Sequence, residues 1–193
     1  MYMSLQEINF ALFDLLNASE YASNLAIEIA IFIANDLFYW VIFGFVLAWF
    51  KGNFLVKKYI VKALIFTCIA FMVSQMISTW FYTPRPFVID LGRTLIEHKP
   101  NGSFPSDHML FFSTIAFSYI YSAQKKIGFL FLAMAICVAW SRVYLGVHFP
   151  FDMMGAGFIA LLLNILGLSA WNNYGVQITQ KVVAVYRLSL IHI

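Results

Sequence analysis

Long apolar segments dominate this chain and limit the folds that are open to it. A helix needs about 20 apolar residues to cross the hydrocarbon core of a membrane. Five stretches approach this length, and we expect them to span the membrane: residues 24–50, 60–81, 106–121, 127–146 and 151–171. Only 11% of the residues are charged, whereas soluble domains carry about 25%. The sequence therefore predicts an all-α integral membrane protein, built as a bundle of about five transmembrane helices.

The two ends of the chain are less apolar than the spans. Residues 5–16 place apolar side chains at helical spacing around Glu7 and Asp14, which predicts an N-terminal amphipathic helix lying in the membrane interface. Polar residues interrupt the tail from residue 172 onwards, so we expect it at the interface too, with a sixth span as the alternative. No internal repeat or linker divides the sequence, and residues 1–193 are interpreted as one domain.

The basic residues predict how the bundle is oriented. Eight of them fall between the first and second spans, between the third and fourth, or in the tail: Lys51, Lys57, Lys58, Lys62, Lys125, Lys126, Lys181 and Arg187. With five spans these segments share one side, which the positive-inside rule assigns to the cytoplasm. The other four lie on the opposite side: Arg85, Arg93, Lys99 and Arg142. Because these four residues are exceptions to the positive-inside rule, we expect that side to bind an anionic group.

Three polar segments meet on this second side. They read TPRPF at residues 83–87, SFPSDH at 103–108 and SRVYLGVHFPFD at 141–152. Pro105 and Pro150 suit the first position of a helix, where the missing N–H would have had no partner. The free backbone N–H groups at a helix start attract an anion. We therefore expect the second and third segments to open the third and fifth spans beside a common anion site.

The side chains in these segments suit phosphoryl transfer. Arg85 and Arg142 offer planar guanidinium groups that match phosphate oxygens, and Ser106 adds a hydroxyl donor. His148 has Asp152 four residues further on, close enough for the carboxylate to hold the imidazole in one tautomer. Our hypothesis makes His148 the nucleophile that attacks phosphorus, and His108 the acid that protonates the leaving oxygen.

The same three segments resemble the signature motifs of the type 2 phosphatidic acid phosphatase (PAP2) superfamily in order and spacing. The motif-bearing part covers residues 80–160, and FPSDH together with AWSRVYLGVHFPFDM is most similar to bacterial undecaprenyl-diphosphate phosphatases. The resemblance implies a phosphatase that uses no metal or cofactor and forms a phosphohistidine intermediate. It assigns His148 as the nucleophile, Asp152 as its orienting partner, His108 as the acid, and Arg85, Ser106 and Arg142 as phosphate ligands.

Two positions depart from the family pattern. The superfamily often has a lysine seven residues before its first-motif arginine, where this chain has Ser78, and Arg93 or Lys99 is the candidate to replace that charge. A glycine is usual between the serine and the histidine of the second motif, where this chain has Asp107. We expect Asp107 to orient an arginine, to cap the helix or, with Ser141, to complete the phosphate site.

The resemblance, together with the predicted orientation, implies a lipid phosphatase of the bacterial plasma membrane with its site on the extracytoplasmic face. The expected reaction cleaves undecaprenyl diphosphate to the monophosphate and inorganic phosphate, which recycles a lipid carrier of cell-wall synthesis. Phosphatidylglycerophosphate, phosphatidate and lipid A are alternative substrates, and a small anion channel or transporter is the alternative of another class. The expected partners are the polyprenyl substrate and membrane lipids. A net charge of +3, without a basic stretch rich in aromatic residues, argues against nucleic acid.

Two polar residues outside the motifs, Asp36 and His98, lie where polar side chains need a partner or water. Asp36 lies within the first span and is expected to pair with Ser74 or Gln75 of the second as a structural contact, with a role in substrate passage as the alternative. His98 lies in the polar loop between the first two motifs, and we expect it to be solvated or next to the substrate rather than catalytic.

Overall fold

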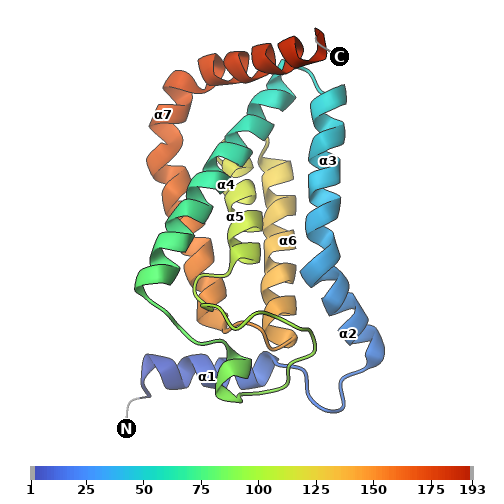
Figure 1. Cartoon of the computed structure of the whole chain (residues 1–193), viewed down its shortest axis with the longest axis vertical. Helices are drawn as coiled ribbons and strands as arrows, with labels where there is room; N and C mark the ends of the chain where they lie inside the picture. The colour runs from blue at the N-terminus through green and yellow to red at the C-terminus, as the bar shows by residue number, and fades with distance from the viewer. Residues whose placement is uncertain (1–2, 192–193) are drawn as a thin grey trace.

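All regular structure in the described part of this chain is helical. The computed structural model describes residues 3–191, with side chains described up to residue 188. Along the chain the elements are α1 (Leu5–Leu16), α2 (Asn24–Ile31), the π-helix η1 (Phe32–Asp36), α3 (Leu37–Lys51), α4 (Phe54–Trp80), the 3₁₀-helix η2 (Pro86–Ile89), α5 (Asp107–Ile120), α6 (Lys125–Tyr144) and α7 (Pro150–Ile191). The helices form an upright bundle, and α1, with its predicted bounds, lies across one end of it (Figure 1). The predicted fold class is confirmed.

Four helical segments are long and apolar enough to cross a membrane. They are Asn24–Lys51, Phe54–Trp80, Lys125–Tyr144 and Pro150–Leu188, and the first of them joins α2, η1 and α3. The predicted span at residues 106–121 corresponds to α5, which has 14 residues. A helix of that length rises about 21 Å, less than the ~30 Å hydrocarbon core. Four of the five predicted spans therefore reach the length of a membrane-crossing helix, and α5 does not.

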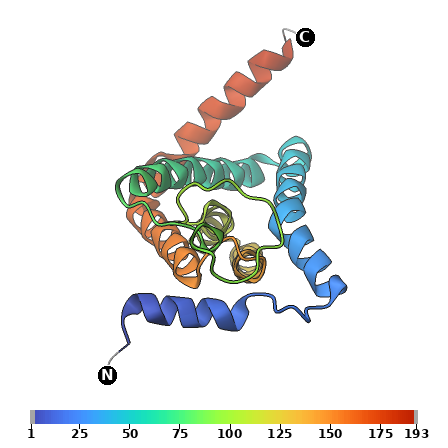
Figure 2. The same cartoon turned by 60° about the horizontal axis from the view of Figure 1, so that its bottom comes forward.

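The short helix α5 occupies the centre of the bundle. Figure 2 shows it surrounded by α4, α6 and α7, and nine of its 14 residues are buried. Because neighbouring helices rather than lipid cover α5, it does not need the full length of a span. The polar side chain of Asn164 on α7 is fully buried against it, donating to the Thr114 carbonyl (3.3 Å) and accepting from the Ser118 hydroxyl (2.9 Å).

Lys62, on α4, forms hydrogen bonds with the C-terminal end of α5. Its ammonium group is buried, and it donates hydrogen bonds to the carbonyl oxygens of Ser118 (3.0 Å) and Tyr121 (3.3 Å) and to the hydroxyl of Ser122 (3.0 Å). These carbonyls lie where α5 ends, and the last turn of a helix leaves such acceptors without intrahelical partners. Lys62 therefore satisfies the C-terminal end of the central helix.

The basic segments share one end of the bundle. The α3–α4 connection, the α5–α6 connection and the C-terminal part of α7 all lie at the end opposite α1 (Figure 1). The prediction that Lys57, Lys58 and Lys62 belong to the α3–α4 connection was wrong, because α4 begins at Phe54. Asn53 caps that helix start, its side-chain oxygen accepting a hydrogen bond from the N–H of Val56 (3.1 Å).

The C-terminal tail continues α7. The sequence suggested that the last span ends at residue 171, but the helix runs to Ile191. Figure 1 shows α7 turning at the end of the bundle, so that its last part runs across the ends of other helices. There the ring of Tyr186 lies 5.6 Å from the ring of Trp49 on α3, and the ammonium group of Lys57 lies over both. The tail thus packs on the basic end of the bundle.

Two local expectations need correction. α7 begins at Pro150 as predicted, but α5 begins at Asp107, two residues after Pro105, because Ser106 takes the extended conformation of a cap residue. Asp36 does not pair with Ser74. Asp36 is exposed, whereas Ser74 is buried on the face of α4 that meets α5.

We expect Lys62→Met to destabilise the protein, because the Ser118 and Tyr121 carbonyls and the Ser122 hydroxyl each lose a hydrogen bond from Lys62 while the apolar volume is kept. Unpaired buried acceptors cost about 1–3 kcal/mol, so the thermal unfolding temperature in detergent should fall. Circular dichroism on heating measures the shift. Lys58→Met, on the same helix, is the control, and equal shifts in the two variants would contradict the role given to Lys62.

Candidate active site

The three polar segments meet at the end of the bundle that α1 crosses. Arg85 immediately precedes η2, Ser106 precedes the first turn of α5, and the third segment runs from the last turn of α6 into the first turn of α7. Figure 2 shows the connection between η2 and α5 passing over the ends of α5 and α6. The backbone joins two segments directly, since the N–H of Ser106 donates to the carbonyl of Asp152 (3.4 Å).

His148 and Asp152 form a buried pair. His148 Nδ1 lies 3.3 Å from Asp152 Oδ2, and the two residues are 2% and 4% exposed. The same carboxylate oxygen accepts hydrogen bonds from the N–H of Phe149 (2.8 Å) and from the hydroxyl of Ser103 (2.5 Å). The Phe149 N–H and the Ser103 hydroxyl therefore hold the carboxylate against the imidazole.

The surroundings of His148 determine its tautomer. Nδ1 faces a carboxylate and so carries the hydrogen, whereas Nε2 lies 2.9 Å from Arg85 Nη1, which can only donate. Burial lowers the pKa of His148 to about 4, and the hydrogen bond with Asp152 opposes this shift. The contact with Asp152 is therefore a hydrogen bond of a neutral imidazole rather than an ion pair. Nε2 keeps the lone pair that a nucleophile needs.

Arg85 links the loops around this pair. Besides the contact with His148, Nη1 donates to the Val147 carbonyl (2.8 Å), Nη2 donates to the Gly102 carbonyl (3.1 Å), and Nε donates to the side-chain oxygen of Asn101 (3.0 Å). The arginine is buried. Its guanidinium group thus fastens two loops together and presents one donor at the nitrogen that would attack phosphorus.

The side chains of Arg142 and Ser106 each have a buried polar atom without a hydrogen-bond partner in the described part of the chain. They are 2% and 0% exposed, and neither Arg142 Nε nor Ser106 Oγ has a hydrogen-bond partner in the described part of the chain. No carboxylate there lies within ion-pair distance of Arg85 or Arg142. Burying an unpaired charge costs several kcal/mol. These donors are therefore placed for a ligand that brings negative charge and oxygen acceptors.

His108 belongs to the same cluster. It lies in the first turn of α5 and is half-buried. The charges of Arg85 and Arg142 act on both His108 and His148, and the charge of His148 also acts on His108. Both rings therefore lie at one end of the bundle, within electrostatic range of the two arginines. His108 also lines a hollow between α3 and α4, where its ring lies 6.2 Å from that of Phe38.

Asp107 and Ser141 are hydrogen-bonded elsewhere. Asp107 Oδ1 accepts a hydrogen bond from the Ser74 hydroxyl (3.0 Å), which ties the start of α5 to α4. Ser141 donates its hydroxyl to the Val138 carbonyl of its own helix (2.9 Å). The negative charge of Asp107 acts on Arg85 from a distance. Asp107 thus fixes the start of α5 to α4, and the hydroxyl hydrogen of Ser141 is used in a hydrogen bond within α6.

Arg93 forms its hydrogen bonds outside the buried cluster. Arg93 Nη1 donates to the Ser19 carbonyl (2.7 Å), and the Arg93 N–H donates to Asn17 Oδ1 (2.6 Å). These bonds fasten the loop to the segment that follows α1. Lys99 is exposed. The guanidinium group of Arg93 therefore does not replace the positive charge that the family's lysine carries at the position of Ser78. It binds the Ser19 carbonyl outside the site instead.

Sequence reasoning assigned no role to Ser103 and expected His98 to be solvated or next to the substrate. The Ser103 hydroxyl lies 3.3 Å from His148 Nδ1 as well as against Asp152, and the only signal for it was its place at the start of the SFPSDH segment. The His98 ring lies 6.2 Å from the His148 ring, and its Nδ1 donates to the Lys99 carbonyl (3.0 Å). Among the described residues, no group of three or more His, Cys, Asp or Glu is placed to hold a metal ion.

Comparison with known proteins identifies the family of this site. The model of the PAP2 superfamily matches residues 59–175. The chain belongs to the PAP2 superfamily. This PAP2 protein is 34% identical to the putative undecaprenyl-diphosphatase YbjG of Escherichia coli over 185 residues, which cover 95% of this chain and 93% of the relative. The resemblance seen in the three segments is confirmed.

A second relative and a solved structure agree with this family. The chain is 25% identical to the undecaprenyl-diphosphatase BcrC of Bacillus subtilis, over 82% of each chain. The crystal structure of Aquifex aeolicus LpxE superposes with a TM-score of 0.61 at 22% identity, covering 86% of this chain and 99% of that one. At this identity the structural likeness shows the fold alone.

Ser103→Ala should lower the rate of phosphate release, because Asp152 then loses one of the donors that hold it against His148. A hydrogen bond to a charged group contributes about 1.5–3 kcal/mol, so kcat/KM should fall by roughly 10- to 100-fold. The matched control is Ser113→Ala, since the buried hydroxyl of Ser113 bonds only within α5. Identical kinetics for the two variants would remove Ser103 from the site.

The imidazole of His148 should titrate well below the usual histidine range, near its lowered pKa of about 4. The Asp152 carboxylate favours the protonated ring, so Asp152→Asn should lower that pKa further. Nuclear magnetic resonance of labelled histidines, with His148→Ala to assign the signal, measures both values. A titration near 6.5 in the unchanged protein, or an upward shift in Asp152→Asn, would contradict this electrostatic picture.

Proposed function

We propose that this PAP2 protein hydrolyses undecaprenyl diphosphate to undecaprenyl phosphate and inorganic phosphate. The relatives named undecaprenyl-diphosphatase support the choice of substrate. The observation that carries the reaction is the pair of buried arginines, Arg85 and Arg142, without carboxylate partners in the described part of the chain, beside the His148–Asp152 pair. A phosphate group supplies the negative charge that these arginines lack.

Substrate binding prepares the nucleophile. In the structure Arg85 Nη1 donates to His148 Nε2, so the lone pair is occupied. When a phosphate oxygen accepts the hydrogen bond from Arg85 Nη1 instead, the lone pair of His148 Nε2 becomes free to attack phosphorus. Arg142 Nε and Ser106 Oγ, which have no partner among the described residues, then donate to the other phosphate oxygens. These donors stabilise the charge that spreads over the oxygens during transfer.

The reaction then proceeds in two displacements. His148 Nε2 bonds to the terminal phosphorus as the bridging P–O bond breaks, and the Asp152 carboxylate stabilises the positive charge on the ring through the Nδ1 hydrogen. His108 donates a proton to the leaving oxygen of undecaprenyl phosphate. Water next attacks the phosphohistidine, with His108 accepting its proton, and inorganic phosphate and neutral His148 are regenerated.

The proposal places the site on the extracytoplasmic face of the bacterial plasma membrane, with residues 1–193 acting as one domain. The segments rich in lysine lie at the opposite end of the bundle (Figure 1), which the positive-inside rule assigns to the cytoplasm. The released lipid monophosphate would then be available as a carrier for cell-wall synthesis.

Turnover by purified protein tests this function. We expect phosphate release in detergent with chelator present, and a higher kcat/KM for undecaprenyl diphosphate than for phosphatidylglycerophosphate, phosphatidate or lipid A. His148→Ala and His108→Ala should each lower the rate by about 10³-fold or more, with thermal unfolding unchanged.

An acid-labile phosphate on the unchanged protein, absent from His148→Ala, assigns the nucleophile. Inactivity on every lipid of this panel would refute the proposed function. Trapped phosphate that persists in His148→Ala would refute only the assignment of His148.

A further inference from the structure

A third imidazole, that of His98, lies beside the buried cluster. Its ring centre is 6.2 Å from that of His148, with an angle of 73° between the two ring planes. The charges of Arg85 and Arg142 act on His98, and the charge of His98 in turn acts on His108. His98 therefore shares the electrostatic environment of the two histidines in the proposed reaction, although no step of that reaction uses it.

The loop that carries His98 is fixed against the third polar segment. The N–H of Leu95 donates to the carbonyl of Leu145 (3.1 Å), and the side chain of Leu95 packs on the buried cluster that contains Leu145. Gly146 has a φ of 78°, and a Cβ at this position would overlap the carbonyl of Arg93. This close approach of the two backbones holds His98 near His148.

The two ring nitrogens of His98 have different surroundings. Nδ1 carries a hydrogen, because it donates to the Lys99 carbonyl (3.0 Å), which can only accept. Nε2 has no hydrogen-bond partner among the residues whose side chains the structure describes. In a neutral ring Nε2 accepts a hydrogen bond, whereas in an imidazolium it donates one. Nε2 therefore becomes a donor for a phosphate oxygen only after it has bound a proton.

His98 also lines a hollow on the outer side of the loop. The hollow has a volume of about 610 Å³ and is formed by Phe87 of η2 together with residues 94–98. Thr94 and Glu97 are exposed, whereas His98 is half-buried. Because the ring borders both this hollow and the buried cluster, it can exchange a proton with water and still face the site.

The charges around His98 favour its neutral form. Burial lowers its pKa and both arginines lower it further, whereas the hydrogen bond to Lys99 and the charge of Asp107 oppose this shift. Glu97 is not within ion-pair distance, since the only ion pair between described residues joins His148 and Asp152. The charged and titratable groups near the ring are Arg85 before η2, Asp107 and His108 of α5, Arg142 of α6, His148 before α7, and Glu97 and Lys99 on the same loop.

A bound phosphate would change the preferred form of this ring. Its negative charges offset those of Arg85 and Arg142, and a nearby negative charge favours a protonated imidazole. A charge-assisted hydrogen bond from a ring nitrogen to an oxygen is about 2.7–2.9 Å long. A phosphate group on His148 thus lies within reach of a second ring whose centre is 6.2 Å away. Protonation of His98 and its hydrogen bond to phosphate therefore favour each other.

We propose that His98 is a further phosphate-binding residue, which takes up a proton from water when phosphate binds and donates its Nε2–H to a phosphate oxygen. The inference rests on the proposed function, because Arg85 and Arg142 hold the same phosphate, and it adds a ligand whose charge depends on pH. The proton returns to water when inorganic phosphate leaves, so His98 is unchanged after each turnover.

Histidine titration tests the proton uptake. In nuclear magnetic resonance of labelled histidines, the pKa of His98 should lie below 6.5 without phosphate and above 6.5 with saturating inorganic phosphate. His98→Asn assigns the signal by removing it. This variant keeps a donor for the Lys99 carbonyl, because its side-chain amide takes the place of Nδ1. A pKa that phosphate leaves unchanged or lowers would overturn the inference.

Inhibition of turnover by inorganic phosphate tests the hydrogen bond. At low pH the imidazolium of the unchanged protein donates to phosphate, and this donor is lost as the pH rises through the pKa of His98 in the complex. His98→Asn should therefore raise the inhibition constant about 10- to 100-fold near pH 5.5, the effect of losing a hydrogen bond to a charged group. The ratio between the two proteins should fall as the pH rises. The titration of phosphate itself cancels in this ratio, because both proteins meet the same phosphate species.

Two other variants of the loop serve as controls. Lys99→Gln removes an exposed positive charge next to His98, and its inhibition constant should match that of the unchanged protein at every pH. His98→Gln places a neutral amide donor near the position of Nε2, so it should lose less affinity than His98→Asn at low pH. A loss in His98→Asn that is the same at every pH would indicate a structural role alone and overturn the inference.

Failure of this inference differs from failure of the proposed function. Hydrolysis of undecaprenyl diphosphate by the unchanged protein, with a His98 pKa that does not respond to phosphate, upholds the function and removes His98 from the phosphate site. Inactivity of the unchanged protein on every lipid refutes the function, and the inference with it.

Discussion

The guanidinium group of Arg85 connects the loops on which the site depends. It donates to the side chain of Asn101, to the backbone of Gly102 and Val147, and to the ring of His148. An arginine suits this place because its planar group carries five donors in a fixed arrangement, whereas a lysine offers a single point charge. The position of the nucleophile candidate is therefore determined by a contact that spans more than sixty residues of sequence.

Buried charge is the second constraint on this end of the protein. Arg85 and Arg142 lie in the interior without a carboxylate in ion-pair range in the described part of the chain, so the site favours any group that brings two negative charges and several oxygens. Burial, together with these positive charges, also lowers the pKa of His148. The environment that would suit the phosphate of the proposed reaction therefore also keeps the imidazole of His148 unprotonated.

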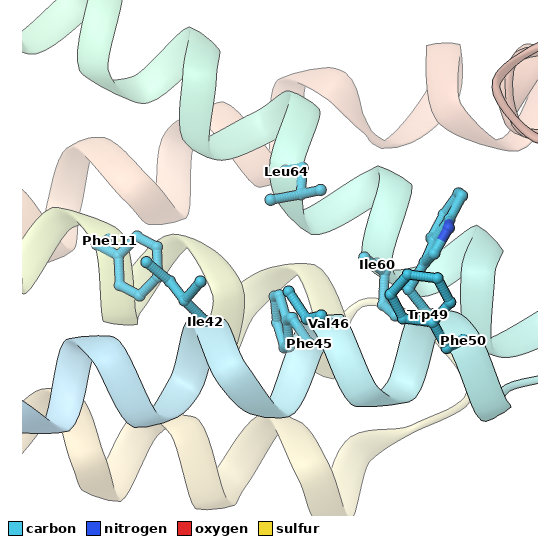
Figure 3. A pocket seen from close by; sticks show the side chains of 8 residues that line it. All are labelled: Ile42, Phe45, Val46, Trp49, Phe50, Ile60, Leu64 and Phe111. Carbon is cyan, nitrogen blue, oxygen red and sulfur yellow. The ribbon is translucent and has the colours of Figure 1, made fainter. Parts of the chain in front are cut away.

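The membrane setting explains how the rest of the chain supports the site. α5 is too short to cross a bilayer, but α4, α6 and α7 cover it, and Lys62 and Asn164 satisfy its polar groups from neighbouring helices. The site lies at the start of this central helix. On one side of it, between α3 and α4, lie a hollow lined by His108 and a second, apolar hollow (Figure 3), and the ring of Phe111 lines both.

The sequence alone determined the features that depend on local pattern. The length of the apolar runs located the helices, helical spacing located α1, and the four-residue separation of His148 and Asp152 indicated a pair on one helix start. It did not reveal that α7 continues past residue 171, that Ser74 meets Asp107 rather than Asp36, or that Ser103 holds Asp152. These last two contacts join residues far apart in the chain. Only the packing of the helices decides them, because periodicity shows which face of a helix is apolar but not which neighbour covers it.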